Sequence, residues 1–375
     1  MNGLKSLAEK LPNYSDKIKG SRIVTGFDGF LDQMISVVDQ RKDLNNYDPV
    51  QSMKQFGDLI KAASNRSSLR EIVIESTEIG GCAVNLGDGI VSLGSSLDFY
   101  GSMGKPMNKA FKDFATRCNL CVPLACDPGL TMAFEFHDGK YMLSSVNQLA
   151  QFNRTMLIDE FKDGRYLQSC KASDLIAFTD WTLYPHMTDC WLYIQDEVLS
   201  KLNHRPYIFI DLVDPRSRSE KDICEMIEVL KKFEKYGKTI FGGNLNEGNV
   251  LAELYHLDSV EKEGPEVAKL AEQIRETLGI SMVALHCTKG AAYADESGNY
   301  WADGPYCSTP RKSTGAGDRF NGGFCLGTIL DLEPEERLIL GGATSGFFVR
   351  YGYSGSMEQI IELMKAWDNN TLDKK

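Results

Sequence analysis

Short apolar runs alternate with amphipathic segments through the second half of the chain. The apolar runs are 175–178, 207–211, 239–241 and 282–285. Between two of them, Ile223, Ile227, Leu230 and Phe233 recur at the three- and four-residue spacing of a helix face. Short apolar strands separated by amphipathic helices are typical of a parallel sheet that helices cover on both faces. This half of the chain therefore predicts an α/β fold.

The first half continues the same alternation. Residues 22–27 and 97–100 predict strands, and residues 80–94 between them predict a helix that begins and ends at glycines. Residues 48–63 predict a further helix, because their apolar side chains fall on one face. The unit from the first strand to the second resembles a strand–helix–strand repeat of an open α/β sheet.

A β-rich part stands apart from this pattern. Residues 131–144 predict a β-hairpin with Asp138-Gly139 in its turn, and residues 71–75 predict another strand. Together they predict a small second sheet, which we interpret as a lid. We expect a single domain over residues 1–375, with lid segments at about 31–80 and 128–147 inserted in it.

Composition and charge narrow the class of protein. The chain has 375 residues, 42% of them hydrophobic, which is enough for a sizeable core. Its formal net charge of -11 argues against a nucleic-acid or anionic-membrane partner, since both need clustered Lys and Arg. No signal peptide or run of about 20 apolar residues is present. We therefore expect a cytoplasmic protein.

The ten cysteines are scattered along the chain. Cys118, Cys121 and Cys126 form an incomplete metal spacing, because no second Cys or His pair completes it. In a chain that lacks a signal peptide, we expect these residues to be reduced thiols.

The stretch Arg311–Phe324 carries the clearest chemistry. Ser313–Gly317 is a run of small residues, and Asp318 opens a helical pattern. Glycines followed at once by a helix point N–H groups and the positive end of the helix dipole at one spot, which favours an anion such as phosphate. Asp318 beside that spot is a candidate general base, as phosphoryl transfer requires. The same residues are also compatible with an ordinary connection in which Asp318 is a helix cap.

Other polar residues follow predicted strands, where open α/β sheets bind ligands. Asp28 and Asp32 follow the first strand, and either carboxylate could accept two sugar hydroxyls. Asn85 lies in the first turns of the helix that Gly80-Gly81 opens. Asn244 and Glu247 could help to hold hydrated Mg²⁺, or could form a simple helix cap.

In combination, these residues resemble a known family. Ser313–Phe320 resembles the C-terminal signature of the PfkB (ribokinase-like) carbohydrate kinases, and Gly80–Asn85 with Leu93-Gly94 resembles the N-terminal one. The two Asp residues near residue 30, Asp214–Arg216, Asn244–Glu247 and Thr288–Gly290 fall in the family's order around them. The resemblance spans the chain from about Ile23 to its last helix.

The resemblance implies a three-layer α/β/α domain with a small β-sheet lid, a sugar between the two, ATP as donor and Mg²⁺ as cofactor. It makes Asp318 the base and the N–H groups of Gly315, Ala316 and Gly317 the anion hole for the transferred phosphoryl group. It assigns the sugar to Asp28 or Asp32, Gly81 and Asn85. It assigns Mg²⁺ to Glu247 and Asn244, and the nucleotide to Asn244, Thr288, Gly290 and Thr314.

Two residues depart from the family's pattern. Lys312 stands where the signature usually has an acidic residue of a monovalent-cation site, so a potassium requirement is in doubt and a lysine ammonium could replace the ion. Cys287 replaces a glycine before Gly290, which puts the geometry of the nucleotide loop in question. The segment 39–68 is also longer than a simple lid needs, and suggests a substrate cover or an interface.

We expect an ATP-dependent sugar kinase. A nucleoside kinase is the alternative, since Phe27, Phe30 and Phe134 could stack on a base, and a catalytically silent sugar-binding relative is a second one. A nicotinamide dehydrogenase is disfavoured, because no Gly-x-Gly-x-x-Gly follows the first strand. Open edges of the lid strands would invite pairing with a second lid, so we expect a homodimer formed through the lid.

Overall fold

The computed structural model describes residues 2–372 and has a nine-stranded sheet at its centre. The strand order is β14-β13-β12-β11-β10-β9-β1-β5-β6. Strands from β12 to β6 run parallel to their neighbours, and β13 and β14 add an antiparallel hairpin at one edge. The strands are β1 (Arg22–Gly26), β5 (Ser96–Gly101), β6 (Leu120–Pro123), β9 (Leu175–Phe178), β10 (Tyr207–Asp211), β11 (Lys238–Asn244), β12 (Met282–His286), β13 (Gly290–Asp295) and β14 (Gly298–Asp303).

Successive side chains of a central strand enter two different cores. On β9, Leu175 and Ala177 belong to one core, whereas Ile176 and Phe178 belong to the other. Side chains alternate across a strand, so a run that is apolar at every position must be covered on both faces. The uninterrupted apolar runs that predict strands in the sequence are the result of this double burial.

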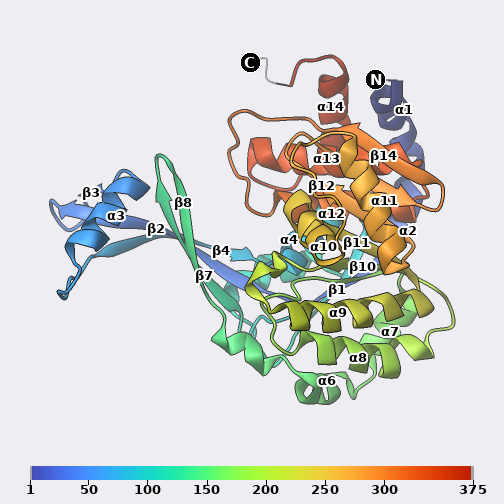
Figure 1. Cartoon of the computed structure of the whole chain (residues 1–375), viewed down its shortest axis with the longest axis horizontal. Helices are drawn as coiled ribbons and strands as arrows, with labels where there is room; N and C mark the ends of the chain where they lie inside the picture. Colours follow the sequence, from blue (N-terminus) through green and yellow to red (C-terminus); the bar gives the residue numbers. More distant parts are fainter. Residues whose placement is uncertain (1, 373–375) are drawn as a thin grey trace.

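Helices form a layer on each face of the central sheet (Figure 1). The core on one face includes side chains of α6 to α11, and the core on the other includes side chains of α4, α5 and α12. Helices α1, α13 and α14 pack outside α12 in a third cluster. The helices are α1 (Asn2–Lys10), α2 (Ser15–Gly20), α3 (Met53–Ala62), α4 (Cys82–Ser92), α5 (Lys112–Arg117), α6 (Arg154–Phe161), α7 (Arg165–Ala172), α8 (Met187–Glu197), α9 (Glu220–Lys232), α10 (Leu245–Leu254), α11 (Glu266–Leu278), α12 (Ala316–Ile329), α13 (Pro334–Tyr351) and α14 (Met357–Asp368).

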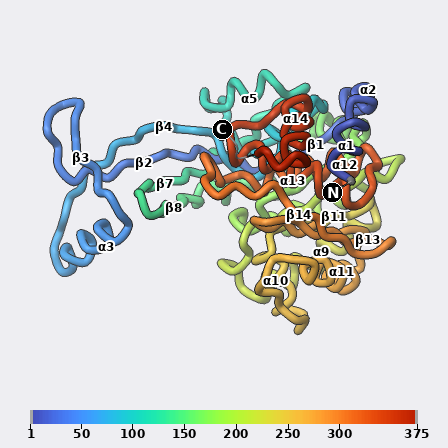
Figure 2. Tube along the Cα trace, turned by 90° about the horizontal axis from the view of Figure 1, so that it is seen from above, coloured from blue at the N-terminus to red at the C-terminus, as the bar shows by residue number. Residues whose placement is uncertain are grey.

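A second, five-stranded sheet extends away from this body as an arm. Its order is β3-β2-β7-β8, with β4 paired to β2. Figures 1 and 2 both show the long strands β2 and β4 leaving the body and carrying β3 and α3 at their far end. The strands are β2 (Phe30–Arg41), β3 (Tyr47–Pro49), β4 (Ile72–Gly80), β7 (Gly129–Phe136) and β8 (Gly139–Ser145).

The arm has a small apolar cluster of its own. Ile35, Val37, Val50 and Phe134 are buried together, and Phe56 of α3 packs on them. Other large apolar side chains of the arm stay exposed to solvent: Ile60, Ile72, Ile74, Tyr141, Met142 and Leu143. The arm therefore has one covered face and leaves a substantial apolar surface uncovered.

Most predicted elements are present, with three differences. The helix predicted over 48–63 begins only at Met53, because residues 47–49 pair with β2 as a short strand. The strand predicted over 71–75 continues to Gly80 as β4. Strand β2 is not among the elements predicted from the sequence. The dipeptide Asp28-Gly29 indicates a turn, and polar residues interrupt the apolar pattern that follows it.

Within residues 2–372, every helix is too short or too polar to cross a membrane. All ten cysteines are free, and most are at least half-buried. No group of three or more His, Cys, Asp and Glu side chains in this part of the chain is arranged to hold a metal ion.

Candidate active site

The candidate residues meet at the carboxyl-terminal edge of the central sheet. Because neighbouring parallel strands end at the same edge, the residues that follow β1, β9, β10, β11 and β12 lie there together. Asp28 and Asp180 follow β1 and β9, and Asp211, Asn244 and His286 are the last residues of β10, β11 and β12. Helices α4 and α12 also begin at this edge of the sheet. The start of α4 contains part of the N-terminal signature, and the start of α12 contains part of the C-terminal one.

Helix α12 begins directly after the glycine-rich turn. Gly315 is its N-terminal cap with φ of 84°, a left-handed conformation that favours glycine. The N–H of Ala316 donates to the carbonyl of Ser313 at 3.0 Å, so it holds the turn and is not a free donor, contrary to the prediction. The N–H groups of Gly317 and Asp318 lie in the first helical turn, where a helix supplies no acceptor for them.

Asp318 lies half-buried at this helix start. The side-chain amide of Asn85 on α4 donates to Oδ2 of Asp318 at 2.9 Å, which joins the beginnings of α4 and α12. Burial raises the pKa of Asp318, whereas Asn85 and the charge of Arg319 oppose that shift. Asn85, predicted as a sugar ligand, therefore contacts the predicted base.

Asp28 is fully buried beneath the start of α4. Its Oδ1 accepts the N–H of Ala83 at 2.9 Å and the hydroxyl of Thr179. Its Oδ2 has no hydrogen-bond partner among the described residues, and lies where a β-carbon on Gly81 would come within 2.4 Å. Gly81 itself has φ of 101°. Burial, reinforced by the charge of Asp318, raises the pKa of Asp28 to about 6.

Asp32 occupies a different position, on strand β2 of the small sheet. It is partly exposed and lies directly opposite Glu78 of β4, so both side chains are on the same face of the sheet. Glu78 in turn forms an ion pair with Lys312, which precedes the glycine-rich turn. Burial raises the pKa of Asp32, while the hydroxyl of Thr131 and the charge of Lys312 lower it. This face of the small sheet is therefore turned toward the loop that leads to Asp318.

Asn244 and Glu247 form the helix cap that their spacing allows. The side chain of Asn244 accepts the N–H of Glu247 at 3.0 Å, and Oε2 of Glu247 accepts the N–H of Asn244 at 2.8 Å. Glu247 is nevertheless 6% exposed, and burial raises its pKa to about 7, with the charge of Asp318 contributing. A helix cap does not require a buried carboxylate close to the charges of Asp318 and Asp214, so capping alone does not explain Glu247.

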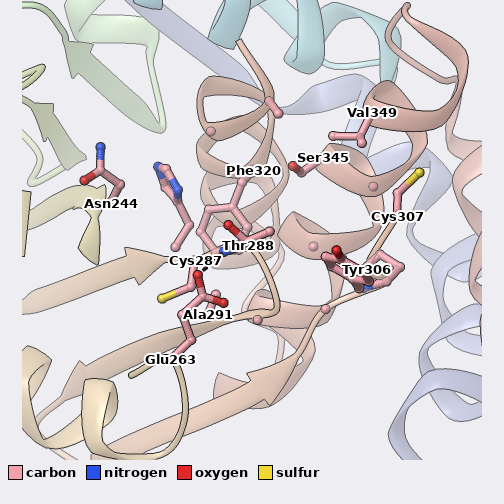
Figure 3. Close-up of a pocket in the computed structure, with 18 of the residues that line it drawn as sticks. Asn244, Glu263, Cys287, Thr288, Ala291, Tyr306, Cys307, Phe320, Ser345 and Val349 are labelled. Atoms are coloured by element: carbon pink, nitrogen blue, oxygen red, sulfur yellow. Dashed lines mark hydrogen bonds between the residues drawn. The ribbon is translucent and has the colours of Figure 1, made fainter. Parts of the chain in front are cut away.

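A cavity of about 400 Å³ adjoins the glycine-rich turn. Three residues predicted to bind the nucleotide line it: Asn244, Thr288 and Gly290. The fourth, Thr314, is exposed, and its neighbour Ser313 lines the cavity. Figure 3 shows Tyr306, Ser345 and Val349 on one side of the cavity and Asn244 and Cys287 on the other.

The turn at Cys287 is tight although the family's glycine is missing. The N–H of Cys287 donates to the carbonyl of Gly290 at 2.8 Å. Glu263 accepts the N–H groups of Thr288 and Lys289 at 3.0 and 2.7 Å, and the first of these bonds is drawn in Figure 3. A carboxylate from another loop therefore fixes the turn, and no local sequence pattern indicates that role.

The aromatic residues considered for base stacking are packed away from the cavity. Phe27 is buried among Phe152, Phe161 and other rings of the main core. Phe30 is also buried, and Phe134 stacks on Phe56 in the arm. The rings of Phe27 and Phe134 are therefore engaged in apolar clusters, whereas the ring of Phe30 lies beside Gly81 at the start of α4.

Comparisons with known proteins agree with this arrangement. The family model described as prokaryotic ketohexokinase matches residues 2–367. The ketohexokinase of Haloferax volcanii is 25% identical over 359 residues, which cover 95% of this chain and 93% of that protein.

Solved structures share the fold. The ribokinase of Thermotoga maritima superposes with a TM-score of 0.62 at 16% identity, covering 92% of this chain and 99% of its own. The adenosine kinase of Sinorhizobium meliloti gives a TM-score of 0.60 at 14% identity, covering 94% and 99%. The predicted ribokinase-like α/β fold with a small sheet is confirmed.

The family match agrees with the polar residues at the sheet edge and with the two helices that begin at glycines. The chain is a carbohydrate kinase, and it belongs to the prokaryotic ketohexokinase family.

Proposed function

We propose that this protein transfers a phosphoryl group from ATP to a hydroxyl of a ketohexose. The observation that carries the proposal is the position of Asp318, which lies in the first turn of α12 with its carboxylate bonded to Asn85. A carboxylate and free helix N–H groups at one point supply a base and an anion site together. The ketohexose is suggested by the name of the Haloferax volcanii relative.

Asp318 accepts the proton of the sugar hydroxyl as that oxygen attacks the γ-phosphorus of ATP. Its raised pKa makes it a stronger base than an exposed aspartate, while Asn85 keeps one carboxylate oxygen in place. The N–H groups of Gly317 and Asp318, with the dipole of α12, stabilise the charge on the transferred group. Ala316 contributes by holding the turn through its bond to Ser313.

The sugar lies between the small sheet and the end of the central sheet. Asp32 is the better candidate for binding sugar hydroxyls, because it is partly exposed and faces the catalytic loop. Asp28 is fully buried, so it acts by holding the N-terminal turn of α4 through Ala83. The left-handed Gly81 and Asn85 lie at the same helix start and border the sugar.

ATP occupies the cavity next to the glycine-rich turn. A volume of about 400 Å³ lies within the usual range for small-molecule sites. Thr288 and Gly290 form one wall through the turn that Glu263 fixes, and Asn244 closes the end toward Asp318. Ala316 and Gly317 also line the cavity, so a nucleotide bound there would lie beside the start of α12.

Glu247 fits a role in holding Mg²⁺. When bound, the ion neutralises phosphate charge during transfer. Mg²⁺ keeps most of its waters and needs few protein ligands, which agrees with the lack of a three-ligand cluster in residues 2–372. Oε2 of Glu247 accepts a backbone bond, so the other oxygen is the one that can hold the hydrated ion. Asn244 orients Glu247 through the cap.

We expect Asp318→Asn to lower kcat by about 10²–10⁴-fold, because the amide cannot accept the proton. The KM values for sugar and ATP should change little, since the side chain keeps its shape and its bond to Asn85. Steady-state kinetics with ADP release as readout checks this. Asp331→Asn, at the far end of α12 and with the same charge change, is the matched control. A D318N enzyme as fast as the control would disprove the role of Asp318.

We infer that activity does not require potassium. The ammonium of Lys312 is fixed by Glu78, and its Nζ lies 5.7 Å from the centre of the Phe348 ring. It brings a permanent positive charge beside the catalytic loop, in the place of the acidic residue of the family's cation site. Assays in potassium and in tetramethylammonium chloride at equal ionic strength should therefore give the same rate. A rate that depends on potassium would contradict the inference.

We also propose that the arm pairs with the arm of a second copy. Ile74 on β4 and Met142 on β8 are 48% and 43% exposed, at the two outer strands of the same small sheet. Exposed apolar strand edges favour pairing with another sheet. Each copy has both outer strands, β4 and β8, so two copies can pair through the same surface in a twofold interface.

Sedimentation should then show a dimer that Ile74→Lys combined with Met142→Lys converts to a monomer. The control is Ile158→Lys, which changes an equally exposed isoleucine on α6 of the main body. A monomeric wild-type protein, or a dimer that survives the double substitution, would rule the arm out as the interface.

A further inference from the structure

Arg319 follows the proposed base and makes an unusual set of contacts. It is 6% exposed, and its guanidinium bonds three acceptors: Nη1 to the carbonyl of Gly315 at 3.0 Å, Nη2 to Oδ2 of Asp88 at 2.8 Å and Nε to the hydroxyl of Ser354 at 2.8 Å. The ring of Phe348 lies 3.8 Å from its central carbon. The three acceptors belong to three separate segments of the chain.

These contacts fix one peptide group of the glycine-rich turn at both ends. The carbonyl of Gly315 accepts Nη1 of Arg319 and also the N–H of Arg319 at 3.3 Å. The N–H on the other side of that peptide, from Ala316, donates to Ser313. A trans peptide is planar, so holding both its oxygen and its N–H sets its orientation. The next donors along the chain, Gly317 and Asp318, are oriented with it.

The same guanidinium ties this turn to α4. Asp88 lies one turn after Asn85 on α4, and Asn85 contacts the carboxylate of Asp318. Ser354 also donates to Asp88 at 2.5 Å, which closes the network between Arg319, Asp88 and Ser354. The relative position of Asn85, Asp318 and the turn therefore depends on one buried charged group.

We propose that Arg319 is a positioning residue for phosphoryl transfer. It holds the N–H groups of Gly317 and Asp318 and the carboxylate of Asp318 in a fixed relative orientation. This inference rests on the proposed kinase function. Only a guanidinium presents several N–H groups in a fixed plane, so lysine cannot reproduce the three bonds. A purely structural role would tie α12 to α4 without any effect on the reaction itself.

The test compares Arg319→Lys and Arg319→Met with the wild type. Arg117→Gln is the control, because Arg117 also pairs with Asp88 at 2.5 Å but is largely exposed and lies on α5. We expect Arg319→Met to lower kcat by about ten- to hundred-fold with little change in KM for ATP, since a misplaced anion site loses transition-state binding. Arg319→Lys should lose less, and the control should keep its kcat.

The pH dependence of kcat/KM distinguishes two effects of Arg319: the position of its hydrogen bonds and its positive charge. Arg319 lowers the pKa of Asp318, so losing its charge should move the acid limb of kcat/KM to higher pH in Arg319→Met but not in Arg319→Lys. The other groups that face Asp318 stay unchanged in both variants: Cys82 and Asn85 on α4 and the carboxylates of Asp28, Asp180, Asp211 and Glu247.

Melting temperatures of all variants identify any loss of folding. If Arg319→Met does not fold, Arg319→Lys decides: a lower kcat at unchanged KM supports the proposal, and an unchanged kcat overturns it. If both variants fold, wild-type kcat in either of them overturns it. A wild-type protein that phosphorylates no sugar refutes the proposed function itself, which is a separate outcome.

Discussion

The hydrogen bond between Asn85 and Asp318 joins the two halves of the site. These residues are 233 positions apart, and each lies at the start of a helix that follows the carboxyl-terminal edge of the sheet. The bond holds the carboxylate of Asp318 in the first turn of α12, where backbone N–H groups lack helical acceptors. The arm is joined to the loop before this turn by the ion pair of Lys312 and Glu78, and the cavity lined by Ala316 and Gly317 adjoins the turn.

Several carboxylates are crowded around that bond. The charge of Asp318 raises the pKa values of Asp28, Asp180, Asp211 and Glu247. Such crowding is unfavourable in the free protein, and a bound divalent ion would relieve it. The charge of Arg319, the next residue on α12, lowers the pKa of Asp318, and Lys312 pairs with Glu78 just before the glycine-rich turn. Positive charge is therefore local, although the whole chain carries a formal net charge of -11.

Local signals predicted the local parts of this site. Gly315 in the predicted glycine-rich turn adopts a left-handed backbone, and the alternation of apolar runs predicted the central sheet. The sequence could not show that Arg319 bonds Asp88 231 residues away or that Lys312 meets Glu78, because such contacts depend on the completed fold. It also missed β2, whose polar residues, Asp32 among them, interrupt the apolar pattern expected of a strand.

We propose that this site phosphorylates a sugar, with a ketohexose as the acceptor. Fluorescence or coupled-enzyme detection of ADP, with purified protein, ATP and Mg²⁺, across a panel of ketohexoses, aldohexoses, pentoses and nucleosides tests it directly. The account predicts ADP release that depends on a ketohexose and a stoichiometric sugar phosphate in the product. Turnover with nucleosides alone, or no turnover with any sugar, would contradict it.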